Sequence, residues 1–219
     1  MKIFIYCMPI SLLSSNPLYF VAWVAAILLT LALHEFSHAY AAHRFGDDTA
    51  KDAGRLTLNP MAHVDWLGFF MLILIGFGWG KPVPVNPYNL KYKKWGSALV
   101  SLAGPFANLI GIVFFGIILK FLAAYAILPA ENLLVQFINL LIIINVVLMA
   151  FNLIPIPPLD GSRLLFTILE NPKYNNFKMR LQTQGPMLLI GLILLDNLFG
   201  IGILSALFRG IIDLVYRVF

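Results

Sequence analysis

A run of almost wholly apolar residues, 21–33, leads without interruption into the ionisable motif His-Glu-x-x-His at residues 34–38. The stretch begins after Asn16-Pro17, a pair typical of a helix start, because asparagine caps the first turn and proline suits the first helical position. A helix over about residues 18–42 is long enough to cross a bilayer. Ionisable side chains are costly in such a helix, so they indicate a functional site.

The motif places two imidazoles one helical turn apart. His34 and His38 lie on the same face of the predicted helix and can bind one zinc ion. Glu35 is next to the first of them, where its carboxylate can take a proton from zinc-bound water. The alternative for this motif alone is a chance match, in which the histidines form a hydrogen-bonded pair in an apolar core.

The composition predicts an all-α polytopic membrane protein. The chain has 219 residues, of which 60% are hydrophobic and 11% charged, whereas a soluble domain is about half apolar and a quarter charged. We expect a single integral-membrane domain, residues 1–219, folded as a helical bundle of about four to six membrane segments. The net charge of +5 is more typical of membrane topology than of nucleic-acid binding. One cysteine, Cys7, excludes both an internal disulfide and a cysteine-based zinc site.

Two further membrane spans are predicted, at about residues 97–128 and 133–153. Between the first and second spans, residues 66–79 are apolar but short, and glycines and prolines are dense at residues 76–87. We therefore expect a re-entrant or strand-like insertion after the zinc-motif helix. After a mostly polar stretch, residues 187–219 are apolar again, but polar residues interrupt them and the sequence does not predict their path.

Two histidines do not complete a catalytic zinc site, which uses three protein ligands and leaves one position for water. His43 lies beyond the turn that would bring it to the metal, and His63 is expected at the surface or on the substrate side. Among the carboxylates, Asp47, Asp48 and Asp52 are expected in an exposed loop.

Asp160 is the favoured third ligand. It follows a predicted span, in a segment stiffened by three prolines, and Gly161 beside it permits unusual backbone conformations. The alternative is a surface turn at Asp160-Gly161 with a solvated carboxylate, which would be preferred if the first motif were absent.

Taken in order, these features resemble the site-2 protease family of intramembrane zinc metalloproteases, and most of all its small prokaryotic members without accessory domains. The resemblance rests on the motif Leu-His-Glu-Phe-Ser-His-Ala, on Leu-Asn-Pro, on Lys-Pro-Val-Pro-Val-Asn-Pro, on Leu-Ala-Gly-Pro-Phe-Ala-Asn and on a Pro-Pro-Leu-Asp-Gly segment. The first four stretches occupy residues 33–39, 58–60, 81–87 and 102–108, and the last segment lies within the matching stretch 152–163.

The resemblance implies that His34, His38 and Asp160 bind Zn²⁺ and that Glu35 is the catalytic base. It also implies that Asn108, in the Gly-x-x-x-Asn element, lies near the substrate or the oxyanion.

One motif differs from the family's pattern. Many relatives read Asn-Pro-x-Asp-Gly, whereas here Pro157-Pro158 precede Leu159-Asp160, and the asparagine is earlier, at Asn152. Asn152 is thus a second candidate for a substrate or oxyanion contact. For Asn108 and Asn145, hydrogen bonding between helices is the alternative.

We expect an intramembrane zinc endopeptidase of the cell membrane whose partners are the lipid bilayer and the transmembrane segments of substrate proteins. A substrate helix must unwind before cleavage, and residues 82–86 could support it by strand addition. The alternatives are a metal or proton transporter that uses the His, Glu and Asp residues, and a catalytically silent relative.

The proposed ligands also predict a topology. For the ends of the first and third long spans to share one metal, residues 66–79 must dip into the membrane and return, with Gly76, Gly78 and Gly80 near the turn. Basic residues then gather on the side of the active site, which the positive-inside rule assigns to the cytoplasm.

Overall fold

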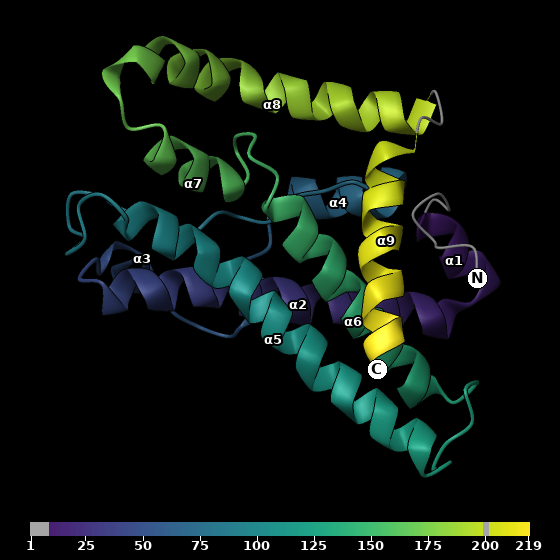
Figure 1. Cartoon of the computed structure of the whole chain (residues 1–219). Coiled ribbons are helices and arrows are strands. Elements are labelled where there is room, and N and C mark those ends of the chain that lie inside the picture. Colours follow the sequence, from purple (N-terminus) through teal and green to yellow (C-terminus); the bar gives the residue numbers. More distant parts are fainter. Residues whose placement is uncertain (1–8, 199–201) are drawn as a thin grey trace.

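The computed structural model of the chain describes residues 9–198 and 202–219, so Cys7 lies outside the described residues (Figure 1). All regular secondary structure in these two ranges is helical, as the sequence predicts. The α-helices are α1 (Pro9–Ser15), α2 (Pro17–Arg44), α3 (Thr49–Asp52), α4 (Trp66–Ile75), α5 (Gly96–Ala124), α6 (Leu133–Asn152), α7 (Gly161–Ile168), α8 (Asn175–Leu198) and α9 (Ile203–Val218). Two short 3₁₀ turns lie at Pro60–Ala62 and Pro172–Tyr174.

Three of the described helices, α2, α5 and α6, are long and apolar enough to cross a membrane. They correspond to the predicted spans, and each packs against the other two. In Figure 1, α5 crosses α2 diagonally, and α6 lies beside both. The predicted total of four to six membrane segments exceeds these three and stays a prediction.

Close packing of small and branched side chains holds these helices together. Ala26 of α2 is fully buried against Leu140 and Leu141 of α6. A second cluster joins α5, α6, α8 and α9 through residues such as Ile112, Val146 and Phe208. Small residues allow helices to approach closely where lipid provides no hydrophobic driving force.

The segment that contains α4 begins and ends at neighbouring positions, Val64 and Gly80. Gly76 adopts the left-handed conformation that ends α4. The chain then turns back, so that Val64 pairs with Gly80 in an isolated antiparallel bridge and the Lys81 N–H donates to the His63 carbonyl at 2.8 Å. The two ends of the segment therefore lie side by side, as the predicted dip and return requires. The strand-like part is limited to this single bridge.

Glycines allow the returning chain to lie against α4. A Cβ atom on Gly78 would come within 2.1 Å of the Gly68 carbonyl oxygen, and one on Gly68 within 2.2 Å of the Trp79 carbonyl oxygen. No side chain fits at either position.

The loop after α2 is more buried than the sequence suggests. Asp47, expected in an exposed loop, is fully buried: it accepts hydrogen bonds from the Asn86 N–H at 2.7 Å and from Asn89 Nδ2 at 3.0 Å. The expectation of a surface position for His63 is also wrong, because it is fully buried between Arg55 and the Thr57 carbonyl. In both cases the returning chain after α4 covers the loop.

The structure shows the path of the C-terminal helices, which the sequence does not predict. Helix α8 begins within the predicted polar stretch and runs along the top of Figure 1, and α9 returns against α6. The end of α9 is held by two hydrogen bonds, from the Tyr216 hydroxyl to Asn139 Oδ1 at 2.7 Å and from Lys120 Nζ to the Val218 carbonyl at 2.9 Å.

Candidate metal centre

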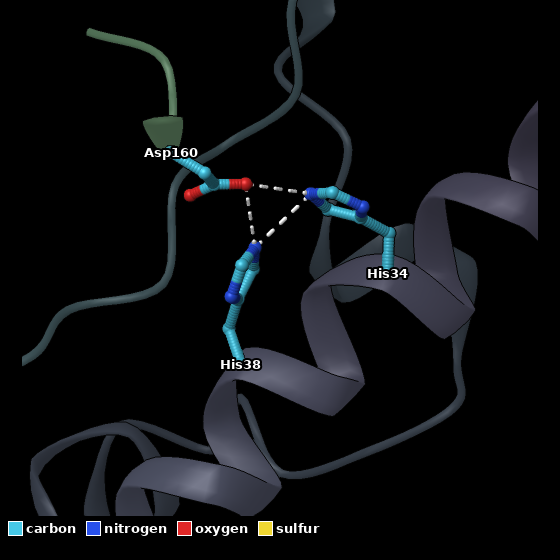
Figure 2. Close-up of side chains that lie close together, drawn as sticks. All are labelled: His34, His38 and Asp160. Carbon is cyan, nitrogen blue, oxygen red and sulfur yellow. Dashed lines mark hydrogen bonds and ion pairs between the residues drawn. The ribbon is translucent and has the colours of Figure 1, made fainter. Parts of the chain in front are cut away.

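Three side chains from two distant parts of the sequence converge on one point (Figure 2). Nε2 of His34 lies 3.0 Å from Nε2 of His38, and Oδ2 of Asp160 lies 3.2 Å from each of these nitrogens. The histidines come from α2, and Asp160 is the residue just before α7. The structure thus brings together the three residues predicted as ligands, in a group that could hold a metal ion.

The other ring nitrogens of both histidines face oxygen acceptors. His34 Nδ1 lies 2.6 Å from Asn108 Oδ1, and His38 Nδ1 lies 2.8 Å from the Val100 carbonyl oxygen. Since these oxygens carry no hydrogen, each Nδ1 must donate. In a neutral imidazole, Nε2 then presents a lone pair, so both histidines direct lone pairs toward each other and toward Asp160.

The two Nε2 atoms and Asp160 Oδ2 have no proton between them, so they cannot form hydrogen bonds with one another. A cation bound at this point would interact favourably with the lone pairs of all three atoms. Asp160 Oδ2 is buried and has no hydrogen-bond partner. Zinc–ligand bonds of about 2.0–2.1 Å in tetrahedral geometry separate neighbouring ligand atoms by about 3.3 Å. The observed separations of 3.0 and 3.2 Å are close to that value. The donor set therefore fits zinc.

Helix α5 forms one wall of the centre because it has no side chain at the point of closest approach. A Cβ atom on Gly104 would lie 2.4 Å from His38 Nε2 and 2.7 Å from His34 Nε2. Pro105 follows inside the helix, and it removes the N–H that would otherwise bond to the Ser101 carbonyl. The glycine thus admits the two imidazoles, and the proline leaves the Ser101 carbonyl without its usual helical donor, one residue after Val100, whose carbonyl bonds to His38.

A second glycine positions Asp160. A Cβ atom on Gly161 would lie 2.3 Å from the Leu153 carbonyl oxygen, so glycine permits the start of α7 to pack on the end of α6. Arg163 adds a hydrogen bond from Nη1 to Ser97 Oγ at 3.2 Å, which links α7 to α5.

Glu35 is partly buried next to this centre, on the turn of α2 that carries His34. Its charge also acts on Arg55, a buried cation: burial lowers the pKa of Arg55, and the Glu35 carboxylate raises it again in part. Arg55 Nη1 donates to the Pro82 carbonyl at 3.1 Å, and Nη2 donates to the Lys81 carbonyl. No sequence motif singles out Arg55, since an arginine in a polar loop looks like any solvated cation.

The two asparagines predicted as substrate or oxyanion contacts occupy different places. Asn108 is fully buried between His34 and Asn145, with Nδ2 donating to Asn145 Oδ1 at 2.9 Å. Asn152 lies at the end of α6, and its Nδ2 donates to the Leu148 carbonyl of its own helix at 2.9 Å. Neither belongs to the three converging side chains, and a direct part in catalysis stays a prediction for both.

The chain is similar to a peptidase family and to proteins named as zinc metalloproteases, which agrees with a metal centre at this point. The family model described as peptidase family M50 matches residues 123–195. The chain is 45% identical over 145 residues to "Putative zinc metalloprotease YwhC" of Bacillus subtilis, a match that covers 65% of this chain and 66% of that protein. It is 36% identical over 150 residues to "Putative zinc metalloprotease Rip2" of Mycolicibacterium smegmatis, with 65% of this chain and 55% of the relative covered.

The protein of the same name from Mycobacterium tuberculosis is equally similar, at 36% over 150 residues. The chain thus matches just under two thirds of the Bacillus relative and about half of each mycobacterial one. No solved structure matches it. With the matching family model, these relatives place the chain in the site-2 protease family, peptidase family M50.

Proposed function

We propose that this protein is an intramembrane zinc endopeptidase that hydrolyses peptide bonds in or near the transmembrane segments of other membrane proteins. The observation that carries the proposal is the convergence of His34 Nε2, His38 Nε2 and Asp160 Oδ2 beside Glu35. The relatives named zinc metalloproteases support zinc as the metal. A single catalytic domain in residues 1–219 is part of the proposal.

The chemistry follows from the residues around that point. His34, His38 and Asp160 would hold zinc, which would act there as a Lewis acid, lowering the pKa of bound water toward neutral and polarising the scissile carbonyl. Glu35 takes the proton from the attacking water and passes it to the nitrogen of the leaving amine. The hydrogen bonds of Asn108 and Val100 keep both imidazoles turned toward the reacting atoms.

A substrate segment must be unwound for cleavage, and residues 81–86 offer it a backbone edge. Proline at positions 82 and 84 favours extended backbone for Lys81 and Val83. In an extended chain, Val83 and Val85 direct their N–H and C=O groups to one edge, whereas Pro82 and Pro84 have no N–H to offer the other.

Arg55 donates to the carbonyls of Lys81 and Pro82 at the start of this segment. Further along it, no hydrogen bond found in the part of the chain that the structure describes involves the backbone of Val83 or Val85. An unwound substrate could pair with these free groups by strand addition.

The proposal places the protein in the cell membrane, with the active site toward the cytoplasm. Lys51 and Lys91 are exposed, and the Lys91 N–H donates to the Phe45 carbonyl just after α2, the helix that carries the zinc motif. The turn between α5 and α6 has no basic residue. The positive-inside rule assigns the basic side to the cytoplasm.

The test compares the parent protein with Glu35→Gln in proteoliposomes, with zinc measured by elemental analysis and cleavage measured on a library of single-span peptides. We expect the parent to carry zinc and to cleave. Glu35→Gln should keep its zinc and lose proteolysis, because an amide cannot accept the proton.

Substantial cleavage by Glu35→Gln would exclude Glu35 as the base. Zinc-dependent ion flux without proteolysis would instead favour the transporter. No present observation favours a transporter, since the described residues contain one such ligand group and the relatives are named metalloproteases.

A further inference from the structure

We infer that a relay of three buried polar side chains, Asn108, Asn145 and Thr30, positions His34 for metal binding. The inference rests on the proposed zinc site and assigns these residues a positioning part rather than contact with substrate. Each of the three is at most 2% exposed, in the middle of the membrane helices. Asn108 lies on α5, Asn145 on α6 and Thr30 on α2.

The relay is continuous from the metal ligand to a backbone carbonyl. His34 Nδ1 lies 2.6 Å from Asn108 Oδ1, and Asn108 Nδ2 lies 2.9 Å from Asn145 Oδ1. Asn145 Nδ2 then donates to the Leu141 carbonyl at 2.7 Å and to Thr30 Oγ1 at 3.3 Å. Both hydrogens of the Asn145 amide nitrogen are thus used.

The donor and the acceptor of each hydrogen bond in the relay follow from the final acceptor, the Leu141 carbonyl. A backbone carbonyl can only accept, so Leu141 requires the nitrogen end of the Asn145 amide. The oxygen of Asn145 must then face Asn108 and accept from its nitrogen, which turns the oxygen of Asn108 toward His34. That oxygen requires a proton on Nδ1 and leaves the Nε2 lone pair for the metal. A carbonyl on α6 therefore selects the ring orientation and tautomer of a ligand on α2.

The relay also closes a ring through three helices. Thr30 and His34 are four residues apart on α2 and therefore lie on one face, so the path returns through α5 and α6 to the helix where it begins. Gly111 makes room for it, because a Cβ atom there would lie 2.8 Å from Asn145 Oδ1. Interhelical hydrogen bonds alone would explain Asn145 as a structural contact. Metal binding distinguishes a positioning role for Asn145 from a purely structural one. Replacing a residue that positions His34 changes zinc binding, whereas replacing a structural contact alone does not.

The experiment measures zinc affinity in the full-length protein by competition with a chelator, and the visible spectrum after substitution of cobalt(II) for zinc. The variants are Asn108→Leu, Asn145→Leu and Thr30→Val. The matched control is Asn139→Leu, which has the same substitution on the same helix and loses an interhelical bond to Tyr216 that does not lead to the metal. Asn108→Asp separates the two bonds of Asn108, since its carboxylate still accepts from Nδ1 of His34 but cannot donate to Asn145 Oδ1.

We expect zinc affinity about 10- to 100-fold lower in Asn108→Leu, as is typical when the hydrogen-bond partner of a ligand is removed. Asn145→Leu should lower the affinity by a smaller factor and shift the cobalt spectrum, and Thr30→Val should act in the same direction. Asn108→Asp should lose less affinity than Asn108→Leu, because it keeps the acceptor for His34 Nδ1, and Asn139→Leu should bind zinc as the parent does.

Parental affinity and an unchanged cobalt spectrum in Asn145→Leu would overturn the relay, and so would equal losses in Asn145→Leu and Asn139→Leu. If Asn108→Leu does not fold, Asn145→Leu and Thr30→Val decide by the same criteria. A parent protein that binds no zinc would instead contradict the proposed function, so the two failures can be told apart.

Discussion

At the scale of single residues, the metal centre depends on which atom of each side chain is left free. His34 and His38 each use Nδ1 for a protein oxygen and keep Nε2 for the common point. Asp160 contributes a buried oxygen that no protein hydrogen bond satisfies. A buried polar atom without a partner is rare, because it loses its hydration without compensation. Binding of a cation accounts for all three atoms at once.

The first prediction concerns Asp160. We expect Asp160→Ala to bind much less zinc than the parent, because it removes one of the three proposed protein ligands. Zinc per chain is measured by elemental analysis after gel filtration in a weak chelator. Asp48→Ala is the matched control, since Asp48 pairs with the exposed His43 outside the centre. Unchanged zinc in Asp160→Ala would remove Asp160 from the site.

The second prediction concerns Gly104. A single methyl group there would lie 2.4 Å from His38 Nε2, so Gly104→Ala must displace an imidazole or α5 itself. We expect a loss of zinc affinity at least as large as the ~10- to 100-fold seen for substitutions beside metal ligands.

Gly191→Ala is the control for Gly104→Ala, because no atom lies within 4 Å of its added methyl group. Chelator competition on both variants provides the measurement. Equal zinc affinities in Gly104→Ala and Gly191→Ala would contradict the prediction, because they would show that α5 shifts to accommodate the methyl group without disturbing the site.

At the scale of elements, the buried carboxylate of Asp47 forms hydrogen bonds that link the chain after the zinc-motif helix α2 to the chain before α5. Asp47 lies three residues after the end of α2 and accepts hydrogen bonds from Thr49, from the Asn86 N–H and from Asn89. Burial raises the pKa of Asp47, and these hydrogen bonds lower it by more, so the net shift is downward. The stabilisation is therefore present above the ordinary aspartate pKa of about 3.9 and is lost as the pH falls through the lower folded-state value.

The third prediction follows from that direction. Asp47→Asn should destabilise the protein at pH 7 by about 1–3 kcal/mol, the usual cost of leaving buried donors without a good acceptor. The difference in Tm from the parent should stay constant down to about pH 5 and shrink below about pH 4, where Asp47 of the unfolded parent chain becomes protonated before that of the folded protein. Asp52→Asn, at an exposed position, should show no such difference. A gap that widens in acid would contradict the assigned direction.

The elements also show where sequence patterns succeed. The start of α2 was predictable because the cap is local, and the Tyr19 N–H does donate to Asn16 Oδ1 at 3.0 Å. The burial of Asp47 was not predictable, because its partners Asn86 and Asn89 are about forty residues away and leave no mark on the local pattern. The same holds for Arg55, whose acceptors lie in the returning chain.

For the metal centre, the motif predicted His34 and His38 from their spacing, and Asp160 from its rigid surroundings. The structure brings all three together. The need for glycine at position 104 and the direction of the Asn108 amide depend on how α5 lies against α2. Such contacts follow from three-dimensional packing, which spacing along one helix cannot reveal.

At the scale of the whole molecule, the metal centre constrains the path of the chain through the membrane. His38 lies toward the C-terminal end of α2, and Asp160 follows the C-terminal end of α6, so these two helix ends must lie at similar depth. One crossing by α5 between them satisfies this condition, whereas a second crossing by α4 would not. A hydrogen bond from the Lys91 N–H to the Phe45 carbonyl at 2.8 Å joins the chain after α2 to the chain before α5.

The last prediction tests this path by labelling single cysteines, placed at Lys51 and at Lys91, in a background where Cys7 is replaced. Both positions are exposed, and the bond between Phe45 and Lys91 holds their segments on one side. An impermeant thiol reagent should therefore label both from the same side of sealed vesicles, because α4, with ten residues, is too short to cross. A cysteine at Glu131, in the turn between α5 and α6, should be labelled from the opposite side. Labelling of Lys51→Cys and Lys91→Cys from opposite sides would mean that α4 crosses, and a zinc site shared by His38 and Asp160 would then be impossible.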